Sequence, residues 1–194
     1  RRHMHEYGTT SRQFGAIAVA CRKHASLNPN AQMRTPITIE DHQNSRMIAD
    51  PFRLLDCSLV SVGEGAVIVT GAERAKDFPH PPAYVMGMGY SCRFGSIAYA
   101  DNLTTVAGKE SSARAFQMAG LTPKDVDVAE LYDCFTYTVL VTLEDYGFCK
   151  KGEGGGFVEN GRIELGGELP VNTHGGLLSQ AHVGGILHVT EAVI

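Results

Sequence analysis

The sequence of residues 120–135 is GLTPKDVDVAELYDCF, and this stretch joins two predicted elements. Val126 to Leu131 predicts a strand, and Phe135 to Tyr146 predicts a helix. Tyr132 therefore lies at the carboxyl end of a strand that leads into a helix. Ligands of open α/β sheets usually bind at that edge, so Tyr132 is a candidate site residue.

Strands and helices are predicted to alternate on either side of this stretch. Residues 83–89 read as a strand, Thr105 to Ala119 as a helix, and the residues from Gly184 onward as a further helix. Strands that alternate with helices favour a sheet covered by helices over a bundle or a sandwich. The predicted fold class is therefore α/β.

The first 82 residues carry weaker signals. Thr10 or Ser11 can cap a helix that runs through Cys21 and stops at Asn28-Pro29. Residues 30–56 predict an extended excursion with a short helix near Glu40. Gly65 to Thr70 is a short β-branched run, which predicts a buried strand. Prolines 79, 81 and 82 predict a linker.

A second stretch, VNTHGGLLSQAHVGG at residues 171–185, places two histidines among glycines just before an amphipathic run. Histidine titrates near neutral pH, and after a glycine turn at the mouth of a helix it can meet a substrate carbonyl beside backbone N–H donors. The alternative is a flexible loop with two solvated histidines. We therefore expect chemistry here, at His182 and near His174.

Composition excludes several classes of protein. Apolar residues make up 43% and charged residues 20% of the 194 positions, which is ordinary for one globular domain. A net charge of −4 without a basic run argues against nucleic-acid binding. Five cysteines without a Cys-x-x-Cys pair favour a reducing cytoplasm over a zinc site. No apolar run approaches the ~20 residues that cross a membrane, and the start does not resemble a signal peptide.

Three stretches together resemble the C-terminal half of the thiolase superfamily: residues 120–147, residues 171–185, and residues 28–34 with 48–57. The nearest resemblance is to thiolases of the sterol-carrier-protein-x type and to bacterial lipid-transfer-type aldolases. It implies a layered αβαβα fold built from two similar halves. Residues 1–56 are then a loop and helical excursion of the first half, residues 57–78 its last strand, and residues 82–194 a C-terminal domain truncated at its end.

The resemblance also implies what completes the site. The nucleophilic cysteine of a thiolase lies in the first half, before the residues matched here. The chain begins at Arg1 and ends inside a helical pattern at Ile194, so we expect a fragment or one piece of a split protein. We accordingly expect a homodimer or a partner subunit that completes the site. The implied substrate is a coenzyme A thioester, with no permanently bound cofactor, in the cytoplasm or, in a eukaryote, the peroxisome.

The resemblance assigns catalytic roles to Tyr132 and His182. His182 matches a family histidine that activates the nucleophile and helps to stabilise an oxyanion, although the family's Gly-His-Pro reads Ala-His-Val here. Tyr132 replaces an Asn or His, and it can act as a proton donor or, with a lowered pKa, as a base. The structural alternative is a strand-end tyrosine that buries its ring.

Further residues are expected to line the active site: Asp133, Cys134, His174, Gly175, Gly176 and Gly184. His174 either lines the cavity or points to solvent, and both readings carry equal weight. Cys134 is interpreted as a core filler more readily than as a nucleophile. No metal site is predicted, because His3, His5 and Glu6 read as a solvated face near the start of the chain.

Three functions follow. The first is a thiolase-type acyltransferase acting on lipid or sterol-derived acyl-CoA, with His182 as the base for a cysteine supplied elsewhere. The second is a thiolase-fold aldolase, in which Tyr132 and His182 move protons during retro-aldol cleavage of a β-hydroxyacyl-CoA with a steroid side chain. The third is a non-catalytic lipid-transfer or scaffold subunit. Tyr132 favours the aldolase, because a phenol suits alkoxide chemistry.

Overall fold

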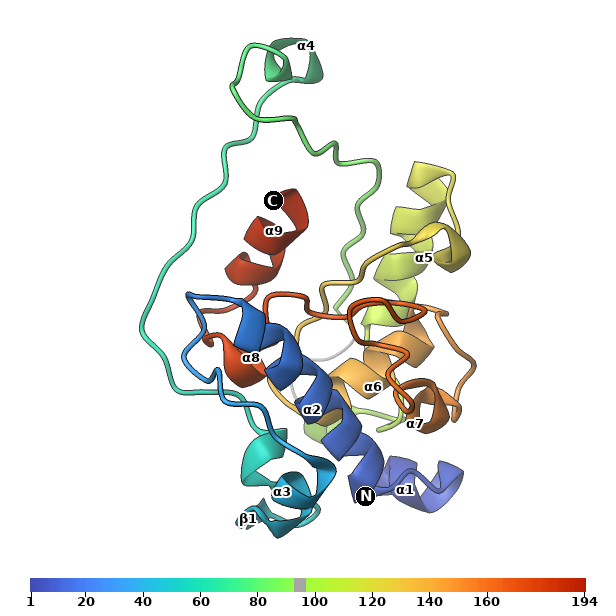
Figure 1. Cartoon of the computed structure of the whole chain (residues 1–194). Coiled ribbons are helices and arrows are strands. Elements are labelled where there is room, and N and C mark those ends of the chain that lie inside the picture. The colour runs from blue at the N-terminus through green and yellow to red at the C-terminus, as the bar shows by residue number, and fades with distance from the viewer. Residues whose placement is uncertain (93–96) are drawn as a thin grey trace.

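The computed structural model describes residues 1–92 and 97–194. Figure 1 shows a group of helices with one long excursion. None of the described helices combines the length and the apolar character needed to cross a bilayer. In chain order the elements are α1 (Arg2–Tyr7), α2 (Ser11–Leu27), α3 (Ile39–Asn44), β1 (Met47–Ala49), β2 (Phe52–Arg53), η1 (Leu54–Asp56), α4 (Ala72–Ala75), η2 (Ile97–Tyr99), α5 (Gly108–Ala119), η3 (Pro123–Asp125), α6 (Thr136–Asp145), α7 (Gly154–Phe157), α8 (Gly176–Ser179) and α9 (Ile186–Val193).

Helix α2 lies at the centre of the molecule. The Thr10 side chain accepts a hydrogen bond from the Gln13 backbone N–H, and Gln13 caps Thr10 in return, so the start of the helix is satisfied reciprocally. The helix ends at Asn28, before Pro29, as predicted. Its buried face follows helical spacing through Phe14, Ile17 and Cys21.

The hydrophobic core forms where α2 packs against α6 and α8. Helix α6 confirms the helix predicted over residues 135–146. Burying a leucine, isoleucine or phenylalanine stabilises the fold by about 1.5–3 kcal/mol per side chain. The principal core residues are Phe14, Ile17, Ala20, Cys21, Leu131, Val139, Leu140, Leu143, Phe157, Val158, Ile163, Val171 and Leu178.

Three other helices agree with the sequence analysis. Helix α3 is the short helix expected near Glu40, and α9 is the helix expected after Gly184. Helix α5 begins three residues later than predicted, at Gly108, and ends as predicted at Ala119. Gly120 ends α5 in the left-handed region with a φ of 69°, a conformation that favours glycine because it has no Cβ.

Two predicted strands are wrong. Residues 65–70 and 83–89 are extended but belong to no strand, and they are largely exposed, with Ile68 81% and Val85 82% exposed. A strand is stabilised by the hydrogen bonds of a neighbouring strand, and the described part of the chain offers these segments none. The sheet found among the described residues is instead the antiparallel pair β1 and β2.

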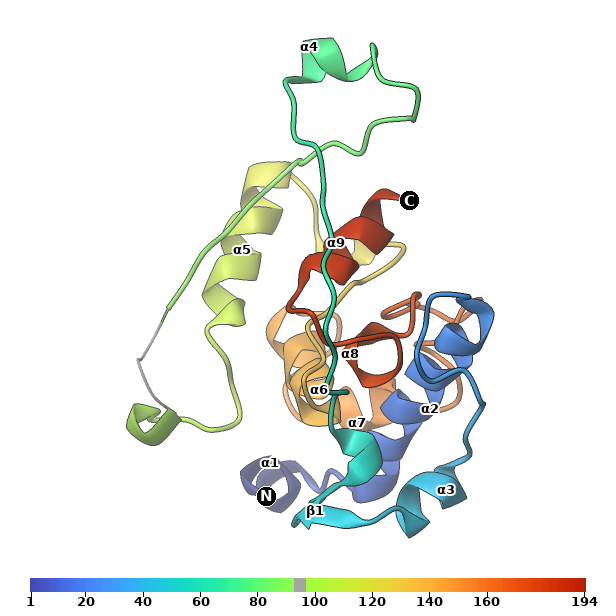
Figure 2. The same cartoon turned by 90° about the vertical axis from the view of Figure 1, so that its left-hand side faces the viewer.

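The long excursion between η1 and α5 contains both of these segments. Figures 1 and 2 show it passing α9, reaching α4 at the far tip and returning beside α5. A Cβ on Gly65 would lie 2.9 Å from the Ile186 side chain, and one on Gly87 would lie 2.1 Å from the carbonyl oxygen of Ala115. The excursion therefore touches α9 and α5 closely along its outward and return paths.

The segment predicted as a strand at residues 126–131 forms only an isolated parallel bridge, between Ala129 and Val171. The Ala129 N–H donates to the Pro170 carbonyl at 3.0 Å, and the Asn172 N–H donates to the Ala129 carbonyl at 3.0 Å. The Asn172 side chain then bonds both the N–H and the carbonyl of Leu131, at 2.7 and 2.8 Å. These contacts bring Tyr132 close to the histidine-containing loop.

Candidate active site

The structure brings together the two residues to which the resemblance assigns catalytic roles. The Tyr132 hydroxyl lies 3.0 Å from Nε2 of His182, although the two residues are 50 positions apart. Their rings meet edge to face with centroids 6.0 Å apart. Tyr132 is 44% exposed, so the hydroxyl and the imidazole face an accessible surface where a substrate can reach them.

Two serines that the sequence analysis missed hold His182 in place. The Ser58 hydroxyl lies 2.9 Å from Nδ1 of His182, and the Ser61 hydroxyl accepts a hydrogen bond from the His182 backbone N–H at 3.1 Å. Ser58 is itself fixed, because its N–H donates to the Cys134 carbonyl at 3.1 Å. Neither serine belongs to a recognisable motif, and Ser58 is 124 positions from His182.

The three side chains form a chain of hydrogen bonds from Ser58 through His182 to Tyr132. When Nδ1 carries the proton and donates it to Ser58, Nε2 is free to accept the proton of Tyr132. Burial, helped by the nearby Cys134 and Asp133, raises the pKa of Tyr132 above that of an ordinary tyrosine. The phenol therefore keeps its proton at neutral pH.

Asp133 occupies a different place from the one expected, because it is fully buried and does not line the accessible surface. Its Oδ1 accepts hydrogen bonds from the Leu177 N–H at 2.8 Å and from Nε2 of His188 at 3.0 Å. Its Oδ2 accepts from the Leu178 N–H at 3.3 Å. Asp133 thus anchors the first turn of α8 and leaves no carboxylate oxygen for a substrate.

The expected glycines divide into two groups. Gly175 and Gly176 are buried, and a Cβ on Gly176 would lie 2.0 Å from Oδ2 of Asp133. A Cβ on Gly175 would lie 2.6 Å from Cβ of Ala25. These two glycines therefore allow close packing inside the protein. Gly184 is exposed two residues after His182, and an added Cβ there would have nothing within 4 Å.

His174 and Cys134 also lie away from the exposed surface. Of the two readings of His174 that the sequence leaves open, its 2% exposure excludes the one in which it points to solvent. Its Nδ1 lies 2.9 Å from Oε2 of Glu130. The Cys134 thiol is half-buried just before α6 and lies 3.4 Å from the hydroxyl of Thr138 on that helix. His188, which the sequence analysis did not single out, packs against His174 with ring centroids 4.9 Å apart.

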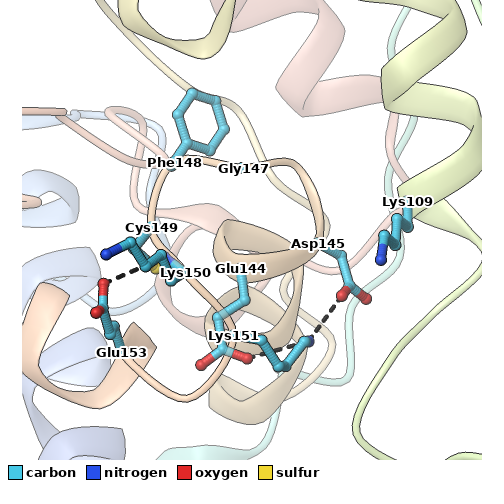
Figure 3. A pocket seen from close by; sticks show the side chains of 9 residues that line it. All are labelled: Lys109, Glu144, Asp145, Gly147, Phe148, Cys149, Lys150, Lys151 and Glu153. Atoms are coloured by element: carbon cyan, nitrogen blue, oxygen red, sulfur yellow. Dashed lines mark hydrogen bonds and ion pairs between the residues drawn. The ribbon is translucent and has the colours of Figure 1, made fainter.

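One cavity among the described residues lies elsewhere, at the end of α6. Figure 3 shows its lining, which includes Lys109, Asp145 and Lys151 but neither Tyr132 nor His182, around a volume of about 590 Å³. Its acids are already paired. Lys151 bonds both Glu144 and Asp145, at 3.1 and 2.7 Å. This cavity therefore offers no uncommitted acid–base pair.

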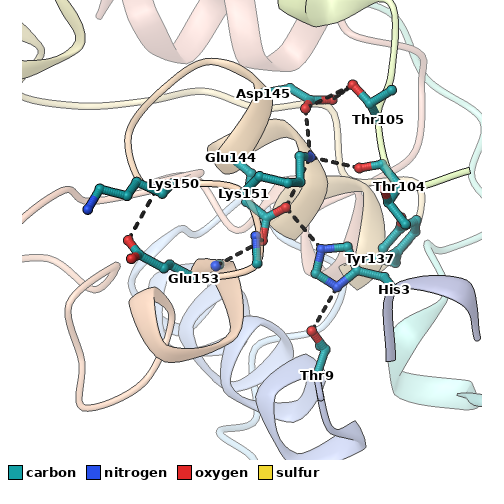
Figure 4. A network of polar contacts seen from close by, with 12 residues as sticks. His3, Thr9, Thr104, Thr105, Tyr137, Glu144, Asp145, Lys150, Lys151 and Glu153 are labelled. Carbon is teal, nitrogen blue, oxygen red and sulfur yellow. Dashed lines mark hydrogen bonds and ion pairs between the residues drawn. The ribbon is translucent and has the colours of Figure 1, made fainter. Parts of the chain in front are cut away.

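A buried network extends from that cavity to the N-terminus (Figure 4). Nε2 of His3 lies 2.9 Å from Glu144 and Nδ1 lies 2.7 Å from Thr9, so the prediction of a solvated face is wrong for His3. Glu144 also accepts hydrogen bonds from the N–H groups of Gly152 and Gly154. Burial raises the pKa of Glu144, but the bonds from His3, Gly154 and Lys151 outweigh it and lower the pKa overall.

Comparison with known families agrees with the fold. Residues 89–194 match the family model described as "Thiolase C-terminal domain-like". The chain belongs to the thiolase family, in agreement with the resemblance drawn from its sequence.

Individual relatives add detail. The chain is 46% identical to a "Steroid side-chain-cleaving aldolase" of Thermomonospora curvata, over 100% of this chain and 51% of the relative. It is 42% identical to an "Acetyl-CoA acetyltransferase" of Methanothermobacter thermautotrophicus, over 99% of this chain and 50% of the relative. The chain thus spans about half the length of the curated relatives it matches.

A solved structure titled "Ltp2-ChsH2(DUF35) aldolase" superposes with a TM-score of 0.89 at 43% identity, covering 99% of this chain and 52% of that chain. The expected thiolase-like α/β fold is confirmed by this similarity. The division of the chain into the segments 1–56, 57–78 and 82–194 stays a prediction, apart from the strand expected in the second of them, which the described residues do not form.

Proposed function

We propose that this chain supplies the acid–base half of an aldolase that cleaves a β-hydroxyacyl-CoA by a retro-aldol step. The observation that carries the proposal is the 3.0 Å contact between the Tyr132 hydroxyl and Nε2 of His182, backed by Ser58 on the opposite ring nitrogen. A proton passes between two groups that are in hydrogen-bond contact or joined by one water, and this pair is in direct contact. The name of the aldolase relative supports a substrate with a steroid side chain.

The raised pKa of Tyr132 sets the form of the mechanism. A phenol that keeps its proton cannot act alone as a base, so the proton must move on as the substrate is deprotonated. The substrate β-hydroxyl gives its proton to the Tyr132 oxygen while the Tyr132 proton passes to Nε2 of His182. Ser58 holds the Nδ1–H tautomer, which leaves Nε2 able to accept.

The electron pair freed by this proton transfer breaks the carbon–carbon bond. The β-carbon becomes a ketone, and the pair of the broken Cα–Cβ bond remains on the α-carbon as a thioester enolate. The imidazolium of His182 returns its proton to the α-carbon through Tyr132, so the enzyme recovers its starting state. No covalent enzyme intermediate and no nucleophile are required.

The acyltransferase is the second candidate, favoured by the likeness to an acetyl-CoA acetyltransferase. It needs a cysteine thiolate as nucleophile. Burial raises the pKa values of Cys21, Cys57 and Cys149, the last to about 12, so these thiols stay protonated. The Cys134 thiol bonds Thr138, and the ring nitrogens of His182 contact Ser58 and Tyr132 rather than a thiol. Among the described residues no thiol is therefore paired with His182, and acyl transfer would depend on a cysteine brought to it from another segment.

We further propose that coenzyme A thioester binding requires polypeptide beyond the residues described. Two features support this: the relatives are about twice as long as the chain, and the Tyr132–His182 pair is open to solvent. A second copy of the chain or a partner subunit would then cover the pair. Excluding water there strengthens the electrostatic interactions on which proton transfer depends.

The two candidate reactions differ in their need for free coenzyme A. The enzyme in its native assembly is incubated with a β-hydroxyacyl-CoA whose β-carbon carries a steroid ring, and products are followed by mass spectrometry. We expect a steroid ketone and a shortened acyl-CoA to form at the same rate with and without free coenzyme A. Cleavage of a β-ketoacyl-CoA that depends strictly on free coenzyme A, without cleavage of the β-hydroxy substrate, would establish the acyltransferase instead.

A further inference from the structure

Behind Tyr132 three side chains bring ligand-type atoms together. They are Glu130, next to the strand end, His174, on the loop after Asn172, and His188, on α9. Each offers one nitrogen or oxygen, and the three atoms all lie within 4.8 Å of one another. Nδ1 of His174 is 2.9 Å from Oε2 of Glu130, and the two imidazole rings are perpendicular with centroids 4.9 Å apart.

These atoms are buried and lack hydrogen-bond partners. His174 is 2% and His188 5% exposed, and the Glu130 side chain is 7% exposed. Oε2 of Glu130, both ring nitrogens of His174 and Nδ1 of His188 form no hydrogen bond, because the His174–Glu130 contact has ion-pair distance but not hydrogen-bond geometry. Buried polar atoms are rarely left without a partner, so this cluster needs an explanation.

The other buried histidines provide a contrast. His3 bonds Thr9 and Glu144, His24 bonds the backbone at Asn172 and Leu165, and His42 bonds Asp56 and Gln43. In each of them both ring nitrogens are satisfied. The free nitrogens of His174 and His188 are therefore a local property of this cluster among the described buried histidines.

The far sides of two of the three residues are held as metal ligands are usually held. Nε2 of His188 bonds Oδ1 of Asp133 at 3.0 Å, which leaves Nδ1 facing the cluster. Oε1 of Glu130 accepts from the N–H and the hydroxyl of Thr173, at 2.9 and 3.0 Å, which leaves Oε2 facing the cluster. A ligating histidine typically donates its other N–H to a carboxylate, and a ligating carboxylate is itself hydrogen-bonded.

We propose that Glu130, His174 and His188 form a binding site for one divalent transition-metal ion of the zinc class. Two imidazole nitrogens and one carboxylate oxygen are a recurrent donor set for Zn²⁺, with the fourth position left for water. At tetrahedral angles, ligand bonds of about 2.0–2.2 Å place two donors about 3.3–3.6 Å apart. The three donor atoms, which lie within 4.8 Å of one another with His174 and Glu130 at 2.9 Å, therefore span this range, and the widest pair has to close by up to about 1.5 Å when the ion binds. This site revises the expectation that the chain holds no metal, and it does not rest on the proposed function.

Metal binding to the full chain tests the proposal directly. The chain is treated with a chelator, dialysed against Zn²⁺ and analysed for bound metal, and Co²⁺ is used as a spectroscopic probe. We expect one Zn²⁺ per chain, a higher Tm with Zn²⁺ than without it, and visible Co²⁺ absorption of a low-coordinate site. Absence of stoichiometric Zn²⁺ and of the Co²⁺ absorption in the wild-type chain would overturn the proposal, whatever the variants do.

Variants locate the bound ion. Glu130→Gln keeps an oxygen that can accept from Thr173 but replaces the carboxylate ligand by a weaker amide, and His174→Asn removes an imidazole ligand. Loss of a residue that only supports a ligand costs up to about 100-fold in metal affinity, so each of these two variants should lower Zn²⁺ affinity by more than that. Thr173→Val removes the hydroxyl that bonds Glu130 and also Glu191 of α9, and it should lower the affinity about 10–100-fold. His5→Asn changes an exposed histidine and should have no effect. Binding lost in His5→Asn and kept in Glu130→Gln would identify a surface contaminant and refute the site.

Discussion

Asp133 shows how a single buried carboxylate positions the candidate site. It accepts hydrogen bonds from α8 through Leu177 and Leu178 and from α9 through His188, and it directly follows Tyr132 in the chain. The position of the Tyr132 hydroxyl therefore depends on an interaction made one residue further on. Gly176 allows that interaction, because its missing side chain leaves room for Oδ2 of Asp133.

Two glycine substitutions separate backbone strain from crowding. Gly176 and Gly184 both have a left-handed φ, of 64° and 70°, which costs a non-glycine residue about 1–2 kcal/mol. Gly184→Ala should cost about that much. Gly176→Ala also places Cβ 2.0 Å from Asp133, so we expect a further loss of about 1–3 kcal/mol. Urea unfolding measures both, and equal losses would contradict the packing role of Gly176.

At the scale of elements, His24 joins α2 to two segments of the C-terminal region. The Leu165 N–H donates to Nε2 of His24 at 3.0 Å, and Nδ1 donates to the Asn172 carbonyl at 3.1 Å. This arrangement requires the neutral imidazole, because Nε2 must accept. Burial lowers the pKa of His24, although the backbone bonds at Asn172 and Val171 oppose the change.

The lowered pKa of His24 predicts a loss of stability in mild acid. The unfolded chain binds a proton at His24 near pH 6.5, whereas the folded chain binds it only at lower pH. The contribution of neutral His24 to the free energy of unfolding is therefore complete above pH 6.5, and it is lost as the pH falls from there through the folded-state pKa. Urea unfolding at pH 7.5 and 5.5 should show a smaller pH effect in His24→Gln than in the wild type. The exposed control His80→Gln should keep the wild-type pH effect; a His24→Gln slope equal to wild type would refute the assignment.

The helices could be predicted from the sequence because their signals are local. For α2 these signals are the capping residue Thr10 and the spacing of the apolar residues on the buried face, and both are contained within the helix and its flank. The strands could not be predicted in the same way, because a strand forms only beside a neighbouring strand, which the sequence does not identify. The segment around Val85 has no such neighbour among the described residues, so it is extended but exposed. The same limit applied to the site. Tyr132 and His182 were found through family motifs, whereas Ser58 reaches them only in the folded chain.

At the scale of the whole molecule, the excursion between η1 and α5 exposes much of the apolar surface. Residues 60–70 and 83–90, which include the two extended segments described above, have unpaired backbone over most of their length among the described residues. An exposed, extended, apolar segment is a template for pairing with another chain. The most exposed large side chains there are Val60, Val62, Ile68, Val69, Val85, Met88 and Tyr90.

Because these segments are exposed, we expect copies of the chain to associate with one another. Light scattering of the purified chain should give a mass above that of the monomer, and the double change Ile68→Lys with Val85→Lys should shift it toward the monomer. Leu27→Lys is a control, because Leu27 is 69% exposed at the end of α2, outside the excursion. A wild-type chain that stays monomeric at all concentrations, with no other polypeptide present, would contradict this prediction.

The central claim is that the Tyr132 hydroxyl exchanges a proton with His182. Removing this hydroxyl tests the claim most directly. Tyr132→Phe in the native assembly keeps the ring and removes only the hydroxyl that lies 3.0 Å from Nε2. We expect kcat to fall by about 10²–10⁴-fold while the urea unfolding midpoint barely changes. Tyr84→Phe, at an exposed tyrosine of the excursion, should leave kcat unchanged. A Tyr132→Phe enzyme with wild-type kcat, or one whose loss of activity is matched by loss of stability, would contradict the account.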